Sequence, residues 1–352
     1  MKNQSDNFHC IDTARIYAGG KTEQIVGNIL KKLPSDQKSS IRLGTKAAPS
    51  AVPEGLSAVG IQSQFKTSMD SLGIQPTTTG GTNDDEPLLY EYYLHQPDTK
   101  HDLLESLKAA DELVKGGKVT KIGMSNYHVT EVKRAFELCT EHNLTPPTVY
   151  QGLYNPLNRM VEDELLPLLT QHNCAFVAYN PLAAGLLTGK HTTKVAAAAA
   201  TEDSEQLPLK GRFFKNPNYL PRFYTPANFQ ALELIQHQCE KDGITLIEAT
   251  FQWLLQESQL DGTKGDGLLL GASSIQQLDQ NLAACQRVVA ASSSETSRMS
   301  PALRQAFDDA WKIVRGQKKN NDGASEGPFC YWRSYSADMP NRETLHQGAS
   351  YN

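Results

Sequence analysis

The sequence predicts an α/β fold in which parallel strands form a (β/α)8 TIM barrel. Short apolar runs alternate with longer amphipathic runs, and each apolar run is followed by a helical pattern. Consecutive parallel strands need such a helical crossover between them. The 352 residues are enough for one barrel of about 250 residues with insertions.

Seven apolar runs have the length and composition of buried strands. In chain order, the predicted strands are 10–12, 41–45, 88–94, 119–124, 149–154, 175–179 and 267–270. The predicted helices have apolar residues three or four positions apart. They are 22–33, 58–72, 102–115, 129–142, 162–172, 229–242, 246–256 and 301–316, and another helix opens within 271–281. The alternation of these elements favours a parallel barrel.

Two polar stretches interrupt this alternation. Residues 75–86 combine proline, threonine, glycine and acids, which is typical of a solvated loop. Residues 191–210 contain five consecutive alanines followed by acids, and an isolated helix this short is marginal in water. We therefore interpret 1–352 as one barrel domain with loop insertions at 75–86 and 191–210 and a C-terminal loop and tail at 317–352.

Composition argues against several classes of function. The 34 basic and 39 acidic residues give a net charge of −5, so no overall positive field attracts nucleic acid or an anionic membrane. The six cysteines are scattered, without CxxC pairs or Cys/His groups at metal-ligand spacing, which is typical of reduced intracellular thiols. No stretch is apolar enough for a signal peptide or a membrane helix. We expect a cytoplasmic protein without a metal site.

Polar residues follow the first three predicted strands. Asp12 and Tyr17 follow the first strand, Lys46 the second and His95 the third, and the carboxyl ends of barrel strands converge on one face. A lysine ammonium stabilises the phenolate left when a tyrosine gives up its proton, and a carboxylate holds that ammonium in place. Singly, each residue is more often structural. Together, they predict a site where Tyr17 donates a proton and His95 either hydrogen-bonds the carbonyl oxygen of a substrate or assists the proton transfer.

The blocks around these residues continue along the chain and resemble the aldo-keto reductases, in the branch of aflatoxin-aldehyde and succinic-semialdehyde reductases. They are IDTARIYAGGKTE, LGTKA, YLHQPD, GKVTKIGMSNY, VYQGLYNPLNR, AYNPLAAGLLTGK, GRFF and LLLGASSIQQLDQNL. The resemblance implies NADPH-dependent reduction of aldehydes or ketones, with Asp12, Tyr17, Lys46 and His95 as the catalytic tetrad. The family's first strand and helix should precede IDTA, so the resemblance also implies a barrel lacking its first β-α unit.

The resemblance implies an NADPH site as well. By position, Ser125, Asn126 and Gln151 hold the nicotinamide carboxamide, and Tyr179 stacks on the ring. The other implied cofactor residues are Asn180, Leu182, Gly185, Leu187, Gly189, Lys190, Arg212, Gly271, Ser273, Ser274, Gln277, Gln280 and Asn281. Many family members carry a lysine and an arginine near the places of Gly271 and Gln277, so the implied preference for NADPH over NADH rests on Arg212, the two serines and the preference of the branch.

The expected substrate is a small aldehyde. Tyr219, Arg222 and Arg333 resemble the branch's substrate loop and C-terminal segment, and His95 completes the predicted substrate site. Two arginines at one pocket favour a carboxylate, because guanidinium pairs with it through two parallel hydrogen bonds.

Other functions remain open at this point. One is a non-catalytic nucleotide-binding regulatory subunit that resembles the β-subunits of potassium channels, and another is an inactive truncated copy. The branch further suggests a homodimer, while neither nucleic acid nor membrane is an expected partner.

Overall fold

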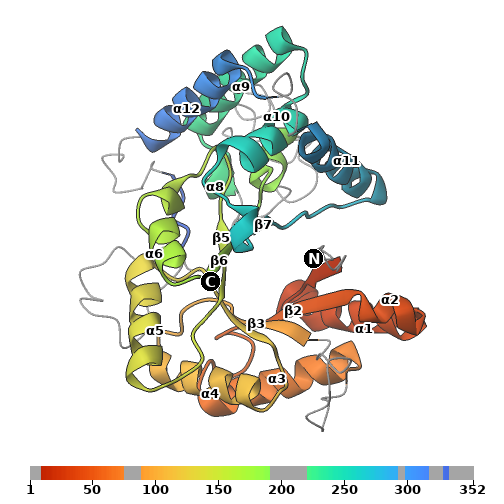
Figure 1. The fold of residues 1–352 in the computed structure, drawn as a ribbon, viewed down its shortest axis with the longest axis vertical. Coiled ribbons are helices and arrows are strands. Elements are labelled where there is room, and N and C mark those ends of the chain that lie inside the picture. The colour runs from red at the N-terminus through yellow and green to blue at the C-terminus, as the bar shows by residue number, and fades with distance from the viewer. Residues whose placement is uncertain (1–8, 75–88, 191–219, 292–297, 317–327, 333–352) are drawn as a thin grey trace, which may run out of the picture.

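The computed structural model describes residues 9–74, 89–190, 220–291, 298–316 and 328–332. The predicted insertions at 75–86 and 191–210 lie outside these ranges, as does all of the predicted C-terminal loop and tail except 328–332. Seven parallel strands form one curled sheet in the order β1-β2-β3-β4-β5-β6-β7, with helices outside it (Figure 1).

All seven predicted strands are present, and each observed end lies within two residues of the predicted one. The strands are β1 His9–Asp12, β2 Ile41–Ala47, β3 Leu89–Leu94, β4 Lys121–Ser125, β5 Val149–Leu153, β6 Ala175–Tyr179 and β7 Gly267–Leu268. Each strand pairs in parallel with the next one in the sequence. Every residue of β5 is buried, as expected for a strand covered on both faces.

Helices separate the strands along the chain. They are α1 Lys21–Lys32, α2 Ser35–Ser39, α3 Ala58–Leu72, α4 Leu103–Lys115, α5 Val129–Glu141, α6 Leu165–Gln171, α8 Leu220–Phe223, α9 Pro226–Asp242, α10 Leu246–Gln252, α11 Ile275–Ala291 and α12 Pro301–Arg315. The described residues include no helix long and apolar enough to cross a membrane.

Capping explains where several helices begin. The Ser57 side chain accepts a hydrogen bond from the Gly60 amide at the start of α3, and Ser300 caps α12 in the same way. Helix α9 begins three residues before the predicted start because Thr225 caps it and Pro226 occupies its first turn.

The sheet does not close among the described residues. Strand β1 pairs only with β2, and β7 pairs only with β6. The helices beside these edges expose apolar side chains: Ile25 and Ile29 on α1, and Ile275, Leu278, Leu282 and Val289 on α11. In Figure 1, β7 and α11 lie in the upper part of the view, and α1 and the red N-terminal strand lie below them. The part of the chain that the structure describes therefore has the predicted barrel fold with one β-α unit absent.

We expect a chain extended at its N-terminus with the first β-α unit of a relative to melt about 5 °C higher than residues 1–352. An inserted strand would pair the free edges of β1 and β7, and its helix would cover apolar surface such as Ile25 and Ile29. Thermal unfolding followed by circular dichroism measures the difference. The control carries a glycine-serine extension of equal length. Equal melting temperatures for all three proteins would contradict this interpretation of the open sheet.

Candidate active site

Backbone pairing beyond the strand ends brings the first two polar groups together. The Thr13 amide donates to the Gly44 carbonyl at 2.8 Å, and the Arg15 amide donates to the Lys46 carbonyl at 3.2 Å. The chain then turns through a short 3₁₀ helix, Tyr17–Gly20. The β1–β2 register therefore places Asp12 beside Lys46 and leaves Tyr17 on the following loop.

Lys46 and Asp12 form a tight ion pair. The Lys46 Nζ lies 2.6 Å from each carboxylate oxygen of Asp12 and 2.8 Å from the Thr13 carbonyl oxygen, and its side chain is fully buried. Burial alone lowers the pKa of Lys46, but the Asp12 carboxylate and the Tyr17 hydroxyl outweigh that effect and raise it above the ordinary value. The ammonium form is therefore favoured. Gln151 donates a further hydrogen bond of 3.0 Å to Asp12 Oδ1.

Tyr17 and His95 complete the group. The Lys46 Nζ lies 5.1 Å from the centroid of the Tyr17 ring. The Tyr17 and His95 rings meet edge to face, with 5.6 Å between their centroids and 77° between their planes. His95 is buried, whereas 36% of the Tyr17 surface is exposed. The structure thus brings the four predicted catalytic residues together, with Tyr17 the one most accessible to a small molecule.

Sequence reasoning missed Glu23, which anchors the loop that carries Tyr17. Its fully buried carboxylate accepts a 2.7 Å hydrogen bond from the Thr45 hydroxyl and forms a 3.3 Å ion pair with Arg15. These contacts tie α1 to β2 and to the loop. Glu23, Gly27 and Leu30 have the spacing i, i+4, i+7, which places them on one face of α1, and this face is buried. An acid on that face was the signal that could have identified Glu23.

The residues predicted to contact the nicotinamide lie at the ends of β4, β5 and β6. The Asn126 side-chain amide donates to the His95 carbonyl at 2.8 Å and to the Ser125 hydroxyl at 2.9 Å. The Tyr179 hydroxyl donates to Asn126 Oδ1 at 2.9 Å. Ser125, Asn126 and Gln151 are all buried. The predicted cofactor residues therefore adjoin the predicted catalytic ones through His95 and Asp12.

The loop after β6 leaves backbone accessible. Gly185 and Gly189 have φ angles of 110° and 74°, which only glycine adopts readily. A β-carbon at Gly185 would meet no heavy atom within 4 Å. Around them, Asn180 has a positive φ, Leu182 is half-buried, Leu187 is buried and Lys190 is exposed. The loop has the open glycine backbone that a pyrophosphate group requires.

The start of α11 carries the remaining described cofactor candidates. The Ser274 hydroxyl accepts from the Gln277 amide at 3.3 Å and caps the helix. The Ser273 amide and hydroxyl both donate to Gln277 Oε1, at 3.1 Å and 2.8 Å. Gly271 and Gln280 are exposed, and Asn281 is buried. Arg212 lies outside the described residues.

Of the predicted substrate residues on the loop and tail, only Arg222 is described, since Tyr219 and Arg333 lie outside. Arg222 is buried, and its guanidinium carbon lies 4.1 Å from the centroid of the Phe329 ring. The Asn158 side-chain amide donates to the Phe329 carbonyl at 2.7 Å, and the Val129 amide donates to the Tyr331 hydroxyl at 3.2 Å. The C-terminal segment 328–332 therefore packs on residues that follow β4 and β5.

His128 contacts the same segment. Its ring meets the Trp332 ring edge to face, with 4.6 Å between their centroids. Burial lowers the pKa of His128 to about 4, so the imidazole is neutral at physiological pH. Its Nδ1 accepts from the Thr130 amide at 3.3 Å and belongs to the capping box of α5, which fixes the ring beneath Trp332.

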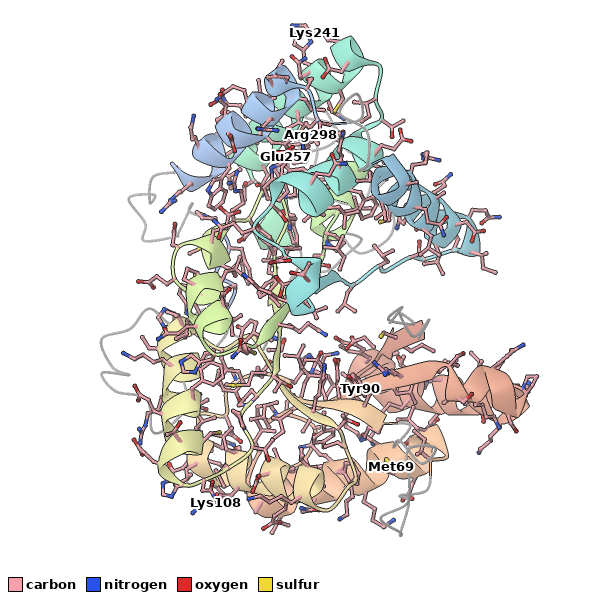
Figure 2. All side chains as sticks on the ribbon, viewed as in Figure 1. Met69, Tyr90, Lys108, Lys241, Glu257 and Arg298 are labelled. Atoms are coloured by element: carbon pink, nitrogen blue, oxygen red, sulfur yellow. The ribbon has the colours of Figure 1, made fainter. Side chains whose placement is uncertain are left out.

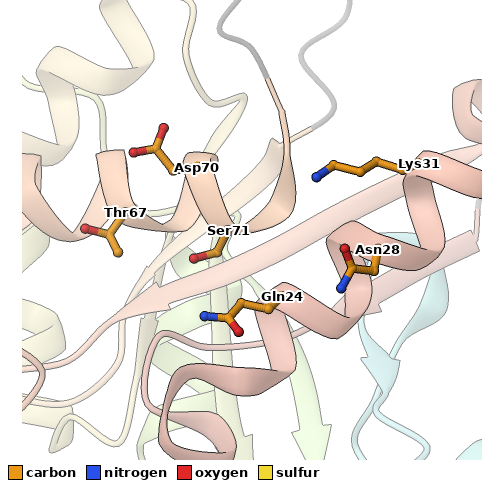
Figure 3. A pocket seen from close by; sticks show the side chains of 6 residues that line it. All are labelled: Gln24, Asn28, Lys31, Thr67, Asp70 and Ser71. Carbon is orange, nitrogen blue, oxygen red and sulfur yellow. The ribbon is translucent and has the colours of Figure 1, made fainter.

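A concave region lies apart from these strand ends. It is a cavity of about 420 Å³ between α1 and α3, lined by Gln24, Asn28, Lys31, Thr67, Asp70 and Ser71 (Figure 3). None of these side chains comes from a strand end. Among the residues that the structure describes, no group of three or more His, Cys, Asp and Glu side chains could hold a metal ion. The strand ends therefore remain the candidate site.

Comparison with known proteins identifies relatives along most of the chain. Residues 5–300 match the aldo/keto reductase family. The chain is 35% identical over 317 residues to aflatoxin B1 aldehyde reductase member 2 of Rattus norvegicus, which covers 88% of this chain and 78% of the relative. It is 33% identical over 317 residues to aldo-keto reductase family 7 member A3 of Homo sapiens, covering 88% and 86%. It is 33% identical over 279 residues to oxidoreductase sirO of Leptosphaeria maculans, covering 79% and 77%.

Proposed function

Because the chain belongs to the aldo/keto reductase family, a family of oxidoreductases that use nicotinamide cofactors, we propose that it reduces aldehydes to alcohols with NADPH and that Tyr17 is the general acid. One observation carries the proposal: the exposed Tyr17 lies beside a buried Lys46 ammonium that Asp12 holds at 2.6 Å. The aldehyde class is supported by relatives named as aldehyde reductases.

The chain's own residues handle the proton. When bound, the reduced nicotinamide supplies the hydride that goes to the carbonyl carbon. Tyr17 gives its hydroxyl proton to the carbonyl oxygen, and the Lys46 ammonium stabilises the phenolate that remains. Asp12 and the Thr13 carbonyl keep Lys46 charged and oriented. His95, edge-on to Tyr17, lies where its ring can contact the same carbonyl oxygen.

The residues around this centre fit a nicotinamide dinucleotide. Ser125, Asn126 and Gln151 offer buried hydroxyl and amide groups at consecutive strand ends, suited to a carboxamide. The open backbone at Gly185 suits a pyrophosphate. The start of α11 suits a phosphate, because helix N-terminal amides favour anions. The preference for NADPH over NADH is proposed on the basis of Arg212 in the sequence and of Ser273 and Ser274 at the start of α11.

The function is tested by following NADPH oxidation with a panel of small aldehydes. We expect oxidation that depends on the aldehyde and yields the alcohol. Tight NADPH binding without oxidation of NADPH by any aldehyde would overturn the proposal and favour a nucleotide-binding regulatory protein. Absence of both binding and oxidation would favour an inactive copy.

We further propose that the preferred aldehydes carry a carboxylate, as a short semialdehyde does. Replacing Arg222 and Arg333 together with alanine should raise KM for such a substrate about tenfold or more, because charge-assisted hydrogen bonds are lost. KM for an uncharged nitrobenzaldehyde should change little. Arg315→Ala, which removes a surface arginine paired with Asp163, is the matched control. Equal effects on both substrates would show that the arginines do not bind the carboxylate.

A further inference from the structure

Two further side chains inside the barrel lie next to Lys46. In the parallel β2–β3 pair, Gly44 is the partner of Glu91 and Lys46 is the partner of Tyr93. Because strand side chains alternate between faces, Glu91 and Tyr93 lie on the same interior face as Lys46. The Lys46 Nζ is 5.4 Å from the centroid of the Tyr93 ring, besides being 5.1 Å from that of Tyr17. The ammonium thus contacts two aromatic rings.

Glu91 fixes the orientation of Tyr93. The Tyr93 hydroxyl donates a 2.6 Å hydrogen bond to Glu91 Oε2. Burial raises the pKa of Tyr93 well above its ordinary value, so this hydroxyl stays protonated and remains a donor. The neighbouring Gly123 makes room for the Tyr93 ring, whereas Gly44 leaves only ordinary contact distance to Glu91. A β-carbon at Gly123 would overlap the Tyr93 ring, and one at Gly44 would lie 3.5 Å from Glu91 Oε2.

The charges around Glu91 connect it to Lys46. Burial raises the pKa of Glu91 above its ordinary value and the Asp12 carboxylate raises it further, while the Tyr93 hydrogen bond, Lys121 and Lys46 act in the opposite direction. Since the Lys46 ammonium stabilises the Glu91 carboxylate, that carboxylate stabilises the ammonium by the same amount. The titratable groups that interact with the Glu91–Tyr93 pair are Cys10 and Asp12 from β1, Lys46 from β2, Lys121 from β4 and Cys174 before β6; Arg42 from β2 interacts with Cys10.

Tyr90, the residue before Glu91 in β3, contacts two basic side chains through its ring. Tyr90, labelled in Figure 2, has the Arg42 guanidinium 4.4 Å and the Lys121 ammonium 4.8 Å from its ring centroid. Glu91 follows Tyr90 in β3 and is half-buried, with Lys121 as its register partner on β4. The Glu91 carboxylate therefore interacts with the Lys121 ammonium from β4 and with the Lys46–Asp12 ion pair.

We propose that Glu91 and Tyr93 are positioning residues for Lys46, which keep its ammonium beside Tyr17 and set the upper pH at which the site donates a proton. The proposal rests on the proposed function, because it concerns the proton that Tyr17 gives. Tyr93 provides the second aromatic contact, and Glu91 provides a second negative charge besides Asp12.

The first test is the pH profile of kcat/KM in Glu91→Gln, which keeps an oxygen to accept from Tyr93 and removes only the charge. We expect the alkaline limb to move to lower pH by about one unit, the order of effect that Coulomb's law gives for one unit charge at an effective dielectric constant of ~20. KM for NADPH should not change. Glu137→Gln, a surface change on α5, is the control and should leave the profile in place. An unmoved alkaline limb in Glu91→Gln overturns the proposal.

Tyr93→Phe tests the positioning role separately, and it keeps the proposal testable if Glu91→Gln does not fold. The ring contact with Lys46 remains, but the hydroxyl that holds Glu91 is lost. We expect kcat to fall about tenfold with KM for the aldehyde unchanged. An unchanged kcat in a folded Tyr93→Phe protein would overturn the positioning of Lys46 through the Tyr93 hydroxyl and Glu91.

A readout without substrate separates this inference from the proposed function. The titration of the Tyr17 ring and the Lys46 side chain, followed together by NMR, reports the proton that the pair loses at alkaline pH. We expect its midpoint to fall in Glu91→Gln whether or not any aldehyde is reduced. A shifted midpoint in a protein without reductase activity would support the positioning role of Glu91 and Tyr93 and refute the proposed function. Reductase activity with an unshifted midpoint would support the proposed function and refute the positioning role.

Discussion

Replacing Tyr17 with phenylalanine is expected to lower the rate of aldehyde reduction by about 10²–10⁴-fold, the contribution of a general acid. The ring and its edge contact with His95 remain, so only the donated proton is lost. NADPH affinity should stay nearly unchanged, because no predicted cofactor contact involves the Tyr17 hydroxyl. Steady-state NADPH oxidation measures the rate, and NADPH fluorescence titration measures the affinity.

A conservative change elsewhere separates proton loss from general damage. Tyr224→Phe removes a hydroxyl from a half-buried tyrosine that packs on Phe229 in α9. It should leave the rate within twofold of the parent, because Tyr224 is not one of the predicted catalytic or cofactor residues. If Tyr17→Phe keeps more than about a tenth of the parent rate, Tyr17 is not the general acid.

Lys46→Met is expected to abolish reduction and also to destabilise the fold. The substitution removes the ammonium that stabilises the Tyr17 phenolate, and among the described residues it leaves the Asp12 carboxylate with the Gln151 side-chain amide as its hydrogen-bond donor. Breaking a largely buried ion pair from one side costs about 3 kcal/mol. Urea unfolding measures the stability, and NADPH oxidation measures the rate.

The matched control for this change is Lys66→Met on α3. Lys66 pairs with Asp70 at the surface, where both side chains are mostly exposed, so this change should alter stability by less than about 1 kcal/mol and leave the rate intact. Full stability in Lys46→Met would mean that Asp12 does not depend on its partner. Full activity would remove Lys46 from the mechanism.

The sheet and the catalytic group were predictable because both follow from patterns local in sequence. Apolar runs located the strands, and parallel order alone places Asp12, Lys46 and His95 at one edge. The ends of elements were less predictable. Predicted helix 246–256 continues as a π-helical turn at Trp253–Glu257, and predicted helix 162–172 begins at Leu165, since side-chain and tertiary contacts set those limits.

Side-chain contacts between segments far apart in the sequence were not predictable, for a different reason. Periodicity identifies the buried face of α1, but it does not show that Glu23 on that face meets Thr45 and Arg15. The position of Tyr93, which bonds Glu91, depends on Gly123 in the flanking strand β4, and this relation is visible only in the register. Arg222 was predicted at a substrate pocket, and its stacking on Phe329 required the C-terminal segment to be placed.

The most direct test of the central claim is hydride transfer itself. The purified chain is incubated with NADPH deuterated at the transferable position of the nicotinamide and with a short semialdehyde, and the alcohol is analysed by mass spectrometry. We predict one deuterium on the carbinol carbon of the product, and a loss of about 10²–10⁴-fold in product formation when Tyr17 is replaced by phenylalanine. An alcohol without deuterium, or unconsumed NADPH in the presence of the parent chain and every aldehyde of the panel, would contradict the claim that this chain is an aldehyde reductase.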